Sequence, residues 1–364
     1  MLGEARSKCE HLVGIPLKPE FAQKLYNITL IKGAVATTAI EGNTLTEEQV
    51  QGIIEGTFSI PDSRRHQEQE VLNVVGALND IQEMIVSGKD IVISEDLILE
   101  FNRQILRNLE LDSEIPSGKY RYHSVVVGGY MGDPAEDCRF LTNKLVEWLN
   151  SDIFKNENPE INFALTIAKA IFAHLYLAWI HPFGDGNGRT ARLVEFLILA
   201  SSGFVPLPAA HLLSNYYNLT RDRYYRELSK VSKNGGKAVE FIVYAAEGFA
   251  DGIREVIKLI REQQLEIAWV NYVYERFESR PNTNANDRML RLILELPIGD
   301  RVAKKDITGL TPQLAQLYSK VGPRTLARDL NQLSNIGLLS IESGKCSARS
   351  DIMLAFLPIV ANKR

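Results

Sequence analysis

The 364-residue sequence has little cysteine and no long apolar run. Its three cysteines, Cys9, Cys138 and Cys346, are widely spaced and form no CxxC pair, which argues against a disulfide framework or a zinc site. No stretch of about 18 apolar residues occurs, and no basic-apolar leader opens the chain. Internal repeats are also absent. We therefore expect a cytoplasmic protein with no membrane contact.

The remaining composition is that of an ordinary globular protein whose charge is unevenly spread. Hydrophobic residues make up 45% of the chain and charged residues 24%, with a net charge of −4. Residues 285–364 carry 12 basic and 7 acidic side chains, a net charge of +5, which leaves −9 for residues 1–284. The polar run 279–286 is typical of a linker. We predict an N-terminal helical region over 1–110, a core with its following helices over 111–278, and a C-terminal domain over 285–364.

Helical periodicity dominates the chain before this linker. Asn158 and Pro159 form a helix-start pattern, and apolar residues then recur at three- and four-residue steps as far as Ala178. The β-branched run 124–130 ends in Gly-Gly-Tyr and predicts a hairpin. The fold class is therefore all-α with a small β-hairpin. Other helices are expected near 46–56, 67–87, 94–109, 138–150, 219–232, 238–249 and 251–277.

The segment His181-Pro-Phe-Gly-Asp-Gly-Asn-Gly-Arg-Thr-Ala-Arg192 joins this helix to the apolar run that follows. Gly186 and Gly188 allow the backbone to approach an anion and to point N–H groups at it from a helix N-terminus. A glycine-rich segment with Asp and Asn is often only a turn. That interpretation leaves the histidine and both arginines unexplained.

The polar side chains of this segment are suited to phosphate chemistry. Asp185 is a hard oxygen ligand appropriate to Mg²⁺. Arg189 and Arg192 lie three residues apart on one helical face, where they can bind phosphate oxygens. His181 is a base near neutral pH.

The segment resembles, residue for residue, the signature HPFx(D/E)GNGRxxR of the Fic family, whose members mostly transfer AMP from ATP to a protein hydroxyl. The resemblance implies a Fic-like helical core that binds ATP and Mg²⁺. It makes His181 the catalytic residue, which takes the proton from a Ser, Thr or Tyr hydroxyl of the target. It makes Asp185 the metal ligand as well as a nucleotide-binding residue. The other residues that it places around the nucleotide are Gly186, Asn187, Gly188, Arg189, Thr190 and Arg192.

A second pattern lies upstream. Residues 37–43, Thr-Thr-Ala-Ile-Glu-Gly-Asn, resemble the (S/T)xxxE(G/N) helix that lies against the nucleotide site in autoinhibited Fic proteins. The resemblance implies that Glu41 pairs with Arg192 and so withholds this arginine from the γ-phosphate. The alternative is that Glu41 is a last-turn helix residue followed by Gly42 as the C′ glycine, with a capping box starting the next helix.

The predicted hairpin is similar to the family's flap, which borders the nucleotide and holds the target segment by β-augmentation. Residues 118–121, Gly-Lys-Tyr-Arg, look like the family's GxxR element. Where many relatives have a pair of prolines, this chain has Tyr-Met-Gly-Asp-Pro at 130–134, so the identity of the target cannot be transferred. The flap residues expected at the nucleotide are Val125, Val126, Val127 and Gly128.

Two aromatic side chains remain to be placed. Tyr224 is similar to the family residue that contacts adenine, although aromatic residues at such spacings are as often part of a core. His174 precedes His181 by seven residues, which invites a metal-site interpretation. We expect it in the helix core instead, because no third ligand is placed nearby.

The C-terminal segment resembles a winged helix-turn-helix domain, with its recognition helix and wing within 322–339. We expect helices at 287–296, within 302–320 and at 323–335, then strands at 337–341 and 352–356 joined through Ser343 and Gly344. The alternative is a protein-docking or dimerisation module of the same shape. The side chains that could meet DNA phosphates are Arg324, Arg328, Lys345 and Arg349.

These patterns predict a protein adenylyltransferase autoinhibited by Glu41, with ATP and a target protein, or another copy of itself, as partners. A Doc-like kinase would typically carry lysine at position 188, so Gly188 favours AMP transfer. A DNA-binding regulator is the other alternative. Relatives with the inhibitory glutamate can also remove AMP from targets, and the sequence leaves this activity open. It also leaves open whether the protein forms a homodimer.

Overall fold

The structure is a computed structural model that describes residues 1–15, 18–88, 91–112, 114–127, 130–233, 238–322 and 324–354. The chain divides into two compact units, Met1–Ile257 and Lys258–Arg364. The division falls inside helix α11 (Val239–Glu278), whereas the polar run at 279–286 leads from α11 into α12 (Asn284–Glu295). The second unit therefore starts earlier than the boundary expected from the polar run.

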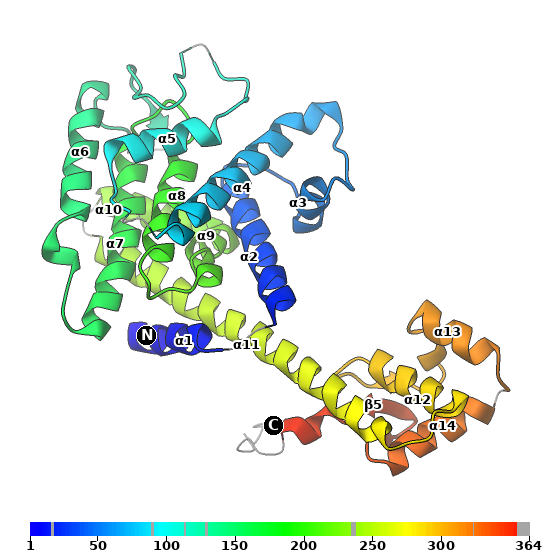
Figure 1. The fold of residues 1–364 in the computed structure, drawn as a ribbon. Coiled ribbons are helices and arrows are strands. Elements are labelled where there is room, and N and C mark those ends of the chain that lie inside the picture. The colour runs from blue at the N-terminus through cyan, green and yellow to red at the C-terminus, as the bar shows by residue number, and fades with distance from the viewer. Residues whose placement is uncertain are drawn as a thin grey trace. The chain divides into compact units, whose positions relative to one another are not determined.

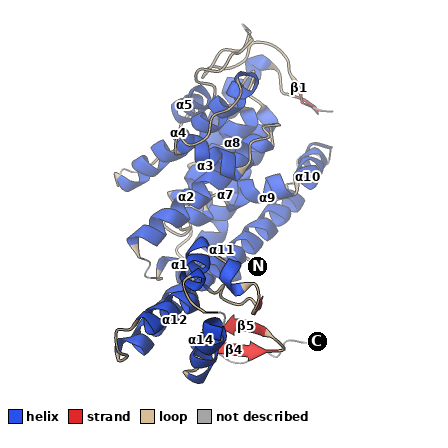
Figure 2. Cartoon of the chain, turned by 90° about the vertical axis from the view of Figure 1, so that its right-hand side faces the viewer, coloured by secondary structure: helices blue, strands red, loops and turns tan. Residues whose placement is uncertain are grey.

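The first unit is helical, as the sequence predicts (Figures 1 and 2). Its helices before the hairpin are α1 (Leu2–Val13), α2 (Pro19–Ala39), α3 (Glu47–Ile54), α4 (Arg65–Val86) and α5 (Glu95–Ile105). After the hairpin come α6 (Cys138–Leu149), α7 (Pro159–Ile180), α8 (Asn187–Ala200), α9 (Leu212–Leu219), α10 (Arg221–Lys233) and the first part of α11.

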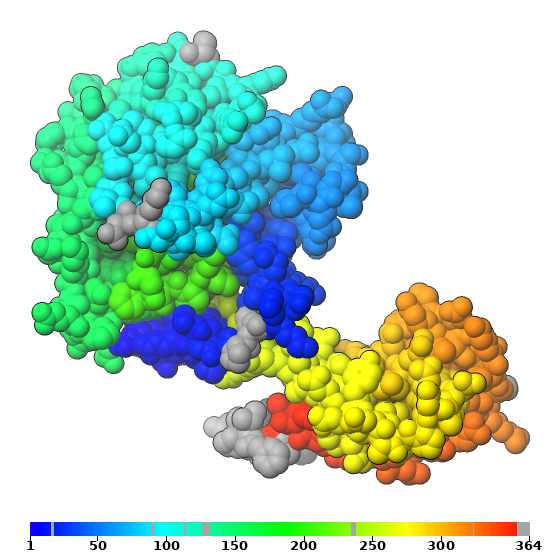
Figure 3. Space-filling model, viewed as in Figure 1, coloured from blue at the N-terminus to red at the C-terminus, as the bar shows by residue number. Residues whose placement is uncertain are grey.

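Helices α7 and α8 form the centre of this unit, and α2, α4, α5 and α6 pack against them. Every residue of α8 except Gly188 is buried. In the view of Figure 3 only a small bright-green patch, the colour of α8 and its neighbouring segments, shows between the other helices. Helix α7 is long and apolar enough to cross a membrane, but 56% of its most apolar window is buried by the surrounding helices, as in the core helix of a globular unit.

Local capping signals place several helix starts where the sequence predicts them. The Asn158 side chain accepts a hydrogen bond from Glu160 N at 2.8 Å and begins α7. Thr46 and Gln49 form the capping box of α3. Because these contacts join residues close in sequence, they could be inferred without tertiary information.

The prediction of separate helices at 238–249 and 251–277 is wrong, because α11 runs through both without a break. The glycines between them serve close packing instead. A Cβ on Gly248 would lie 2.0 Å from the ring of Tyr216, and one on Gly252 would lie 2.9 Å from Leu212. Both neighbours belong to α9, which packs directly on the α11 backbone.

The predicted hairpin is present as β1 (Val126–Val127) and β2 (Tyr130–Met131). The strands are antiparallel, with Val126 opposite Met131 and Val127 opposite Tyr130. Gly128, expected at the nucleotide, lies outside the described residues. The hairpin is attached to the unit beside the end of α7 by contacts described below.

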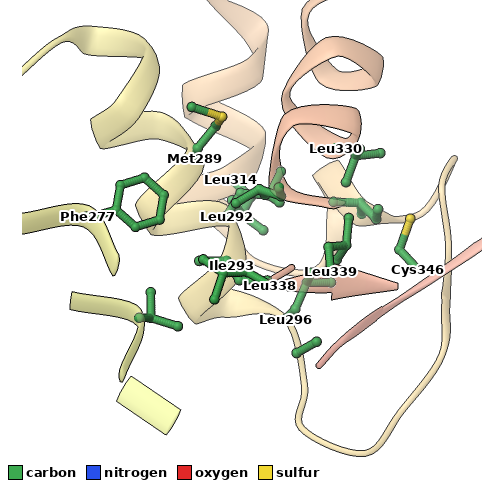
Figure 4. Close-up of a cluster of buried hydrophobic side chains, with 14 of the residues drawn as sticks. Phe277, Met289, Leu292, Ile293, Leu296, Leu314, Leu330, Leu338, Leu339 and Cys346 are labelled. Carbon is green, nitrogen blue, oxygen red and sulfur yellow. The ribbon is translucent and has the colours of Figure 1, made fainter. Parts of the chain in front are cut away.

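The second unit contains the remainder of α11, then α12, β3 (Val302–Ala303), α13 (Pro312–Ser319), α14 (Arg324–Asn335), β4 (Leu339–Glu342) and β5 (Lys345–Ala348). The three strands form an antiparallel sheet in the order β3-β5-β4. Leucines and isoleucines of the helices meet Leu338 and Leu339 in one apolar core (Figure 4). Trp269, Val273 and Phe277 of α11 belong to this core, which explains the early start of the unit.

The prediction of a strand at 352–356 is wrong for residues 352–354, and residues 355 and 356 lie outside the described residues. Ser343 and Gly344 have φ values of 48° and 77° and form a two-residue turn, so the partner of β4 begins immediately at Lys345. Residues 350–354 form a 3₁₀ helix instead. The expected start of the recognition helix, Pro323, lies outside the described residues, and α14 is described from Arg324 onward.

Candidate functional site

His181 caps the C-terminus of α7 in a left-handed conformation, with φ 48° and ψ 57°. A non-glycine residue adopts this conformation only when its surroundings hold it there. Its backbone N–H donates to Leu177 O at 3.1 Å, and Nδ1 lies 3.2 Å from Ala178 O. A carbonyl oxygen only accepts, so Nδ1 carries the proton and Nε2 of the neutral ring keeps its lone pair.

The surroundings of His181 favour the neutral ring. Burial lowers the pKa of this histidine below its usual 6.5, and the positive charge of Arg121 acts in the same direction. The carbonyl of Ala178 and the carboxylates of Glu41 and Asp185 oppose this shift without reversing it. His181 is therefore a free base at neutral pH.

Arg121, the last residue of the GxxR element, fixes the backbone around His181. It is 2% exposed, and its Nε donates to His181 O at 2.7 Å. Its Nη1 and Nη2 donate to His123 O at 2.8 Å and Asp133 O at 2.5 Å, on either side of the hairpin. One guanidinium thus ties both ends of the hairpin to the histidine backbone.

Two asparagines shape the loop after His181. The Asn187 amide accepts from Phe183 N and donates to Phe183 O, both at 2.8 Å, which closes the loop on itself. Asn102 of α5 donates to Asp185 O at 2.9 Å and accepts from Gly118 N at 3.0 Å. The sequence reasoning missed Asn102, whose one signal is a polar residue on the buried face of an amphipathic helix.

Helix α8 begins at this loop and directs its first amide groups outward. Gly186 precedes the helix with φ 78°, and Thr190 N makes the first helical hydrogen bond, to Gly186 O at 2.8 Å. The N–H groups of residues 187–189 therefore have no carbonyl within the helix to bind, which makes the helix start suitable for an anion. The Thr190 side chain is buried against Asn102, so it faces the interior rather than this anion position.

Arg189 lies between two carboxylates. Its Nη2 donates to both oxygens of Asp185 at 3.2 and 3.1 Å, and its Nη1 donates to Glu70 Oε1 of α4 at 2.9 Å. Glu70 is a second residue that the sequence reasoning missed, since nothing in its local pattern distinguishes it from other helical glutamates.

Arg192 is 1% exposed and pairs with Glu41 across 151 positions of sequence. Its Nη2 donates to Glu41 Oε1 at 2.6 Å and to Thr37 O at 2.8 Å. Within the described residues, Arg192 Nε and Nη1 and Arg189 Nε are buried without a hydrogen-bond partner. Such donors are costly unless a ligand satisfies them.

The Glu41 carboxylate lies over the first turn of α8. A Cβ added to Gly188 would be 2.2 Å from Glu41 Oε1 and 3.0 Å from Arg192 Nη1, so glycine at 188 leaves the space that this carboxylate fills. Burial alone would raise the pKa of Glu41, but the charge and hydrogen bond of Arg192, with the charges of Arg189 and His181, lower it. Glu41 is thus an anion held at the anion-binding position.

Asp185 is the residue best placed to hold a metal. Its side chain is 44% exposed, and its carboxylate binds Arg189 and accepts from Gly186 N. The described residues contain no group of three or more His, Cys, Asp or Glu side chains arranged around a metal position. A single carboxylate such as Asp185 suits Mg²⁺ only where phosphate oxygens and water complete the coordination.

The structure places Tyr224 in the core. Its side chain is 2% exposed, and its hydroxyl lies 2.9 Å from His174 Nε2. His174 in turn lies 3.3 Å from Glu195, which also accepts from Tyr217, so His174 is a core residue as expected. With its hydroxyl engaged and almost no free surface, Tyr224 has little to offer an adenine.

Of the predicted hairpin residues, Val125 is half-buried, and its carbonyl accepts from Gly132 N at 3.0 Å. Val126 and Val127 are described as backbone in strand β1. Their expected contact with the nucleotide stays a prediction.

A helix start with free amides, buried arginines and a neighbouring neutral histidine defines a nucleotide-handling loop between two core helices. Residues 92–199 match the model of the Fic/DOC family. The predicted resemblance to the Fic family is therefore confirmed, and so is the predicted helical fold.

Curated relatives extend the likeness beyond this segment. Protein adenylyltransferase fic-1 of Caenorhabditis elegans is 34% identical over 223 residues, covering 61% of this chain and 40% of that protein. Protein adenylyltransferase Fic of Drosophila melanogaster is 33% identical over 171 residues, 47% of this chain and 32% of that protein. The chain thus spans 40% or less of the length of these two relatives.

Solved structures share the fold. The structure of Fic-1 from C. elegans has a TM-score of 0.58 and 28% identity, covering 71% of this chain and 72% of that one. A Fic family protein from Desulfovibrio desulfuricans G20 has a TM-score of 0.56 and 21% identity, and each chain is covered to 95%. At that identity the second likeness concerns the fold alone.

Proposed function

We propose that this protein transfers AMP from ATP to a hydroxyl group of a target protein. The observation that carries the proposal is the set of unsatisfied buried donors on Arg189 and Arg192, next to the amide groups that start α8. These donors suit the phosphates of a nucleotide. The neighbouring base, His181, suits a hydroxyl acceptor, and the relatives' names support this reaction.

In this proposal His181 Nε2 accepts the proton of the target hydroxyl as its oxygen attacks the α-phosphorus of ATP. The bond between the α-phosphorus and the bridging oxygen to the β-phosphate breaks, and pyrophosphate leaves. The amide groups of residues 187–189 hold phosphate oxygens, and Arg189 and Arg192 balance the charge of the β- and γ-phosphates. Mg²⁺ held by Asp185 would neutralise charge on the α- and β-phosphates.

We further propose that Glu41 inhibits this reaction. Its carboxylate pairs with Arg192 and lies over Gly188, so it competes with a phosphate for the same donors. The γ-phosphate of ATP would then bind in a position unsuited to in-line attack. The alternative interpretation, in which Glu41 only ends α2, does not account for a contact with a residue 151 positions away.

The decisive experiment is incubation with Mg²⁺ and ATP labelled at the α-phosphate, using wild type and Glu41→Gly. Mass spectrometry then identifies the acceptor on a target or on the protein itself. A mass increase of one AMP supports transfer. A parallel incubation uses ATP labelled at the γ-phosphate, and transfer of that label alone would favour the kinase alternative. Release of AMP from a modified target would favour removal of AMP.

A second candidate function belongs to the second unit, which we propose is a winged helix that binds duplex DNA. Apart from Ala327, the exposed side chains along α14 are basic or carry amides, and the one acid of α14, Asp329, is buried. Arg288 donates to both oxygens of Asp329, and Tyr318 donates to one of them, so this acid presents no charge to the surface. The exposed polar residues are Arg324, Arg328, Asn331, Gln332 and Asn335.

DNA binding by this surface should weaken steeply with salt, because each phosphate contact releases counterions. Fluorescence anisotropy with random-sequence duplex at several salt concentrations measures it. We expect Arg324→Ala with Arg328→Ala to weaken binding and to reduce the salt dependence. Equal affinity of wild type and the double variant would favour a protein-docking module.

A further inference from the structure

The turn that carries Glu41 is attached to the nucleotide loop at a second point, through Asn43. The Asn43 side chain is buried and uses all its hydrogen-bonding groups: Nδ2 donates to Gln67 O at 2.9 Å and Glu70 Oε2 at 3.0 Å, and Oδ1 accepts from Leu45 N at 3.0 Å. Asn43 thus joins the turn after α2 to helix α4.

Glu70 connects this attachment to the loop. One of its oxygens accepts from Asn43, and the other accepts from Arg189 Nη1 at 2.9 Å. Arg189 then binds both oxygens of Asp185. A continuous chain of hydrogen bonds therefore runs from the residue two positions after Glu41 to the carboxylate suited to the metal.

Resting on the proposed function, we propose that Glu70 is a positioning residue with two roles. Through Arg189 it orients the side chains that bind the nucleotide, and through Asn43 it holds the Glu41 turn in its inhibitory position. Inhibition and nucleotide binding thereby share one carboxylate.

The two roles predict opposite effects on activity. Loss of Asn43 frees the Glu41 turn but leaves the contact between Glu70 and Arg189 in place, so Asn43→Ala activates. Loss of Glu70 also frees the turn, but it leaves Arg189 with Asp185 as its one remaining carboxylate partner among the described residues. In a chain already released by Glu41→Gly, Glu70→Ala therefore impairs ATP use.

The first test measures the turn itself without any nucleotide. The amides of Glu41, Gly42 and Asn43 donate to Thr38 O or Ala39 O, and their hydrogen exchange reports opening of the turn. We expect exchange on the order of tenfold faster in Asn43→Ala and Glu70→Ala, as for loss of a hydrogen bond to a charged group. Glu68→Ala, which removes a carboxylate from the same helix, is the matched control. Unchanged exchange in Asn43→Ala would overturn the proposal.

The second test measures AMP transfer. Asn43→Ala should raise the rate in the wild-type chain but not in Glu41→Gly, whereas Glu70→Ala in Glu41→Gly should raise the KM for ATP severalfold. If the role of Asn43 is purely structural, Asn43→Ala lowers the transfer rate. That result would overturn the coupling between the Glu41 turn and the nucleotide loop. Absence of transfer in every variant, Glu41→Gly included, would refute the proposed function while the exchange result still decides whether Glu70 holds the turn.

Discussion

Glu41 Oε1 lies 2.6 Å from Arg192 Nη2, and Arg192 is buried with two further N–H groups unpartnered among the described residues. The arginine is therefore occupied at one nitrogen and available at the others. A phosphate would bind donors of the same guanidinium, which is why we propose that this carboxylate competes with it.

We expect Glu41→Gly to raise the rate of AMP transfer by roughly ten- to hundredfold, the effect of losing a charge-assisted hydrogen bond. Arg192→Ala should not reproduce this activation, since it removes the phosphate contact together with the inhibitor. Initial rates with labelled ATP over a range of ATP and Mg²⁺ concentrations measure both. Equal rates for wild type and Glu41→Gly would reject the inhibitory role and leave the catalytic one standing.

Replacing His181 by alanine should lower the transfer rate by a factor of about 10² to 10⁴, the usual contribution of a general base. ATP affinity should change little, because the α8 amides and the arginines bind the phosphates. The comparison requires transfer kinetics and calorimetric ATP titration of the same variant, in the Glu41→Gly background. At least half the transfer rate remaining in His181→Ala would exclude the histidine from the mechanism.

For Asp185 we expect Asp185→Ala to abolish the Mg²⁺ dependence of transfer and of nucleotide binding. Asp185→Asn is the conservative control, since it keeps an oxygen ligand but loses the charge that also binds Arg189. Transfer by the unmodified protein in excess chelator would show that the metal assignment is wrong.

His211 should make the protein less stable in acid. Burial lowers the pKa of His211 to about 3, and its ring stacks on Phe196 at 4.3 Å. Between the unfolded pKa of about 6.5 and the folded value, the unfolded chain binds a proton that the folded chain excludes. The free energy of unfolding should thus fall by up to about 1.4 kcal/mol per pH unit as the pH drops through this window.

Urea unfolding of His211→Leu at several pH values tests this expectation, with the exposed His66→Leu as the control. Below pH 6 the curve should be flatter for His211→Leu than for wild type. Parallel curves for all three proteins would contradict the assignment.

The position at which the chain is truncated should decide whether the first unit stays soluble, and the polar run at 279–286 lies too late in the chain for this purpose. A chain ending after Arg261 should stay soluble, whereas one ending after Arg280 keeps Trp269, Val273 and Phe277 without the core that buries them. Solubility and light scattering of the two truncated proteins distinguish these outcomes. Higher solubility of the chain ending after Arg280 would mean that these side chains also stabilise the first unit.

The loop from His181 to Arg192 could be predicted because its chemistry is contiguous in sequence. Helix starts at Asn158 and Thr46 were equally accessible, since capping joins near neighbours. Contacts between distant segments could not be inferred from local pattern, and the pair of Glu41 and Arg192 was expected through the family resemblance alone. Glu70 and Asn102 reach residues 119 and 83 positions away. Nothing local marks Glu70 as part of the site, and the polar side chain of Asn102 on a buried helix face does not say what it binds.

Tyr224 shows a case in which the local sequence pattern is ambiguous. Its spacing suited an exposed ligand contact and a core residue equally well, and only tertiary packing, which engages its hydroxyl with His174, distinguishes the two. Local pattern also misled at Gly248 and Gly252, where a helix-breaking composition instead lets α9 lie against α11.

The absent side chain at position 188 has a consequence for how this protein could change its chemistry. Any Cβ there would collide with Glu41 Oε1 at 2.2 Å. A lysine at 188, the residue typical of Doc-like kinases, would therefore displace the glutamate as soon as it appeared. On the proposed function, a switch of the transferred group and a loss of inhibition would arrive together in one substitution at 188, whereas Glu41→Gly would remove the inhibition alone.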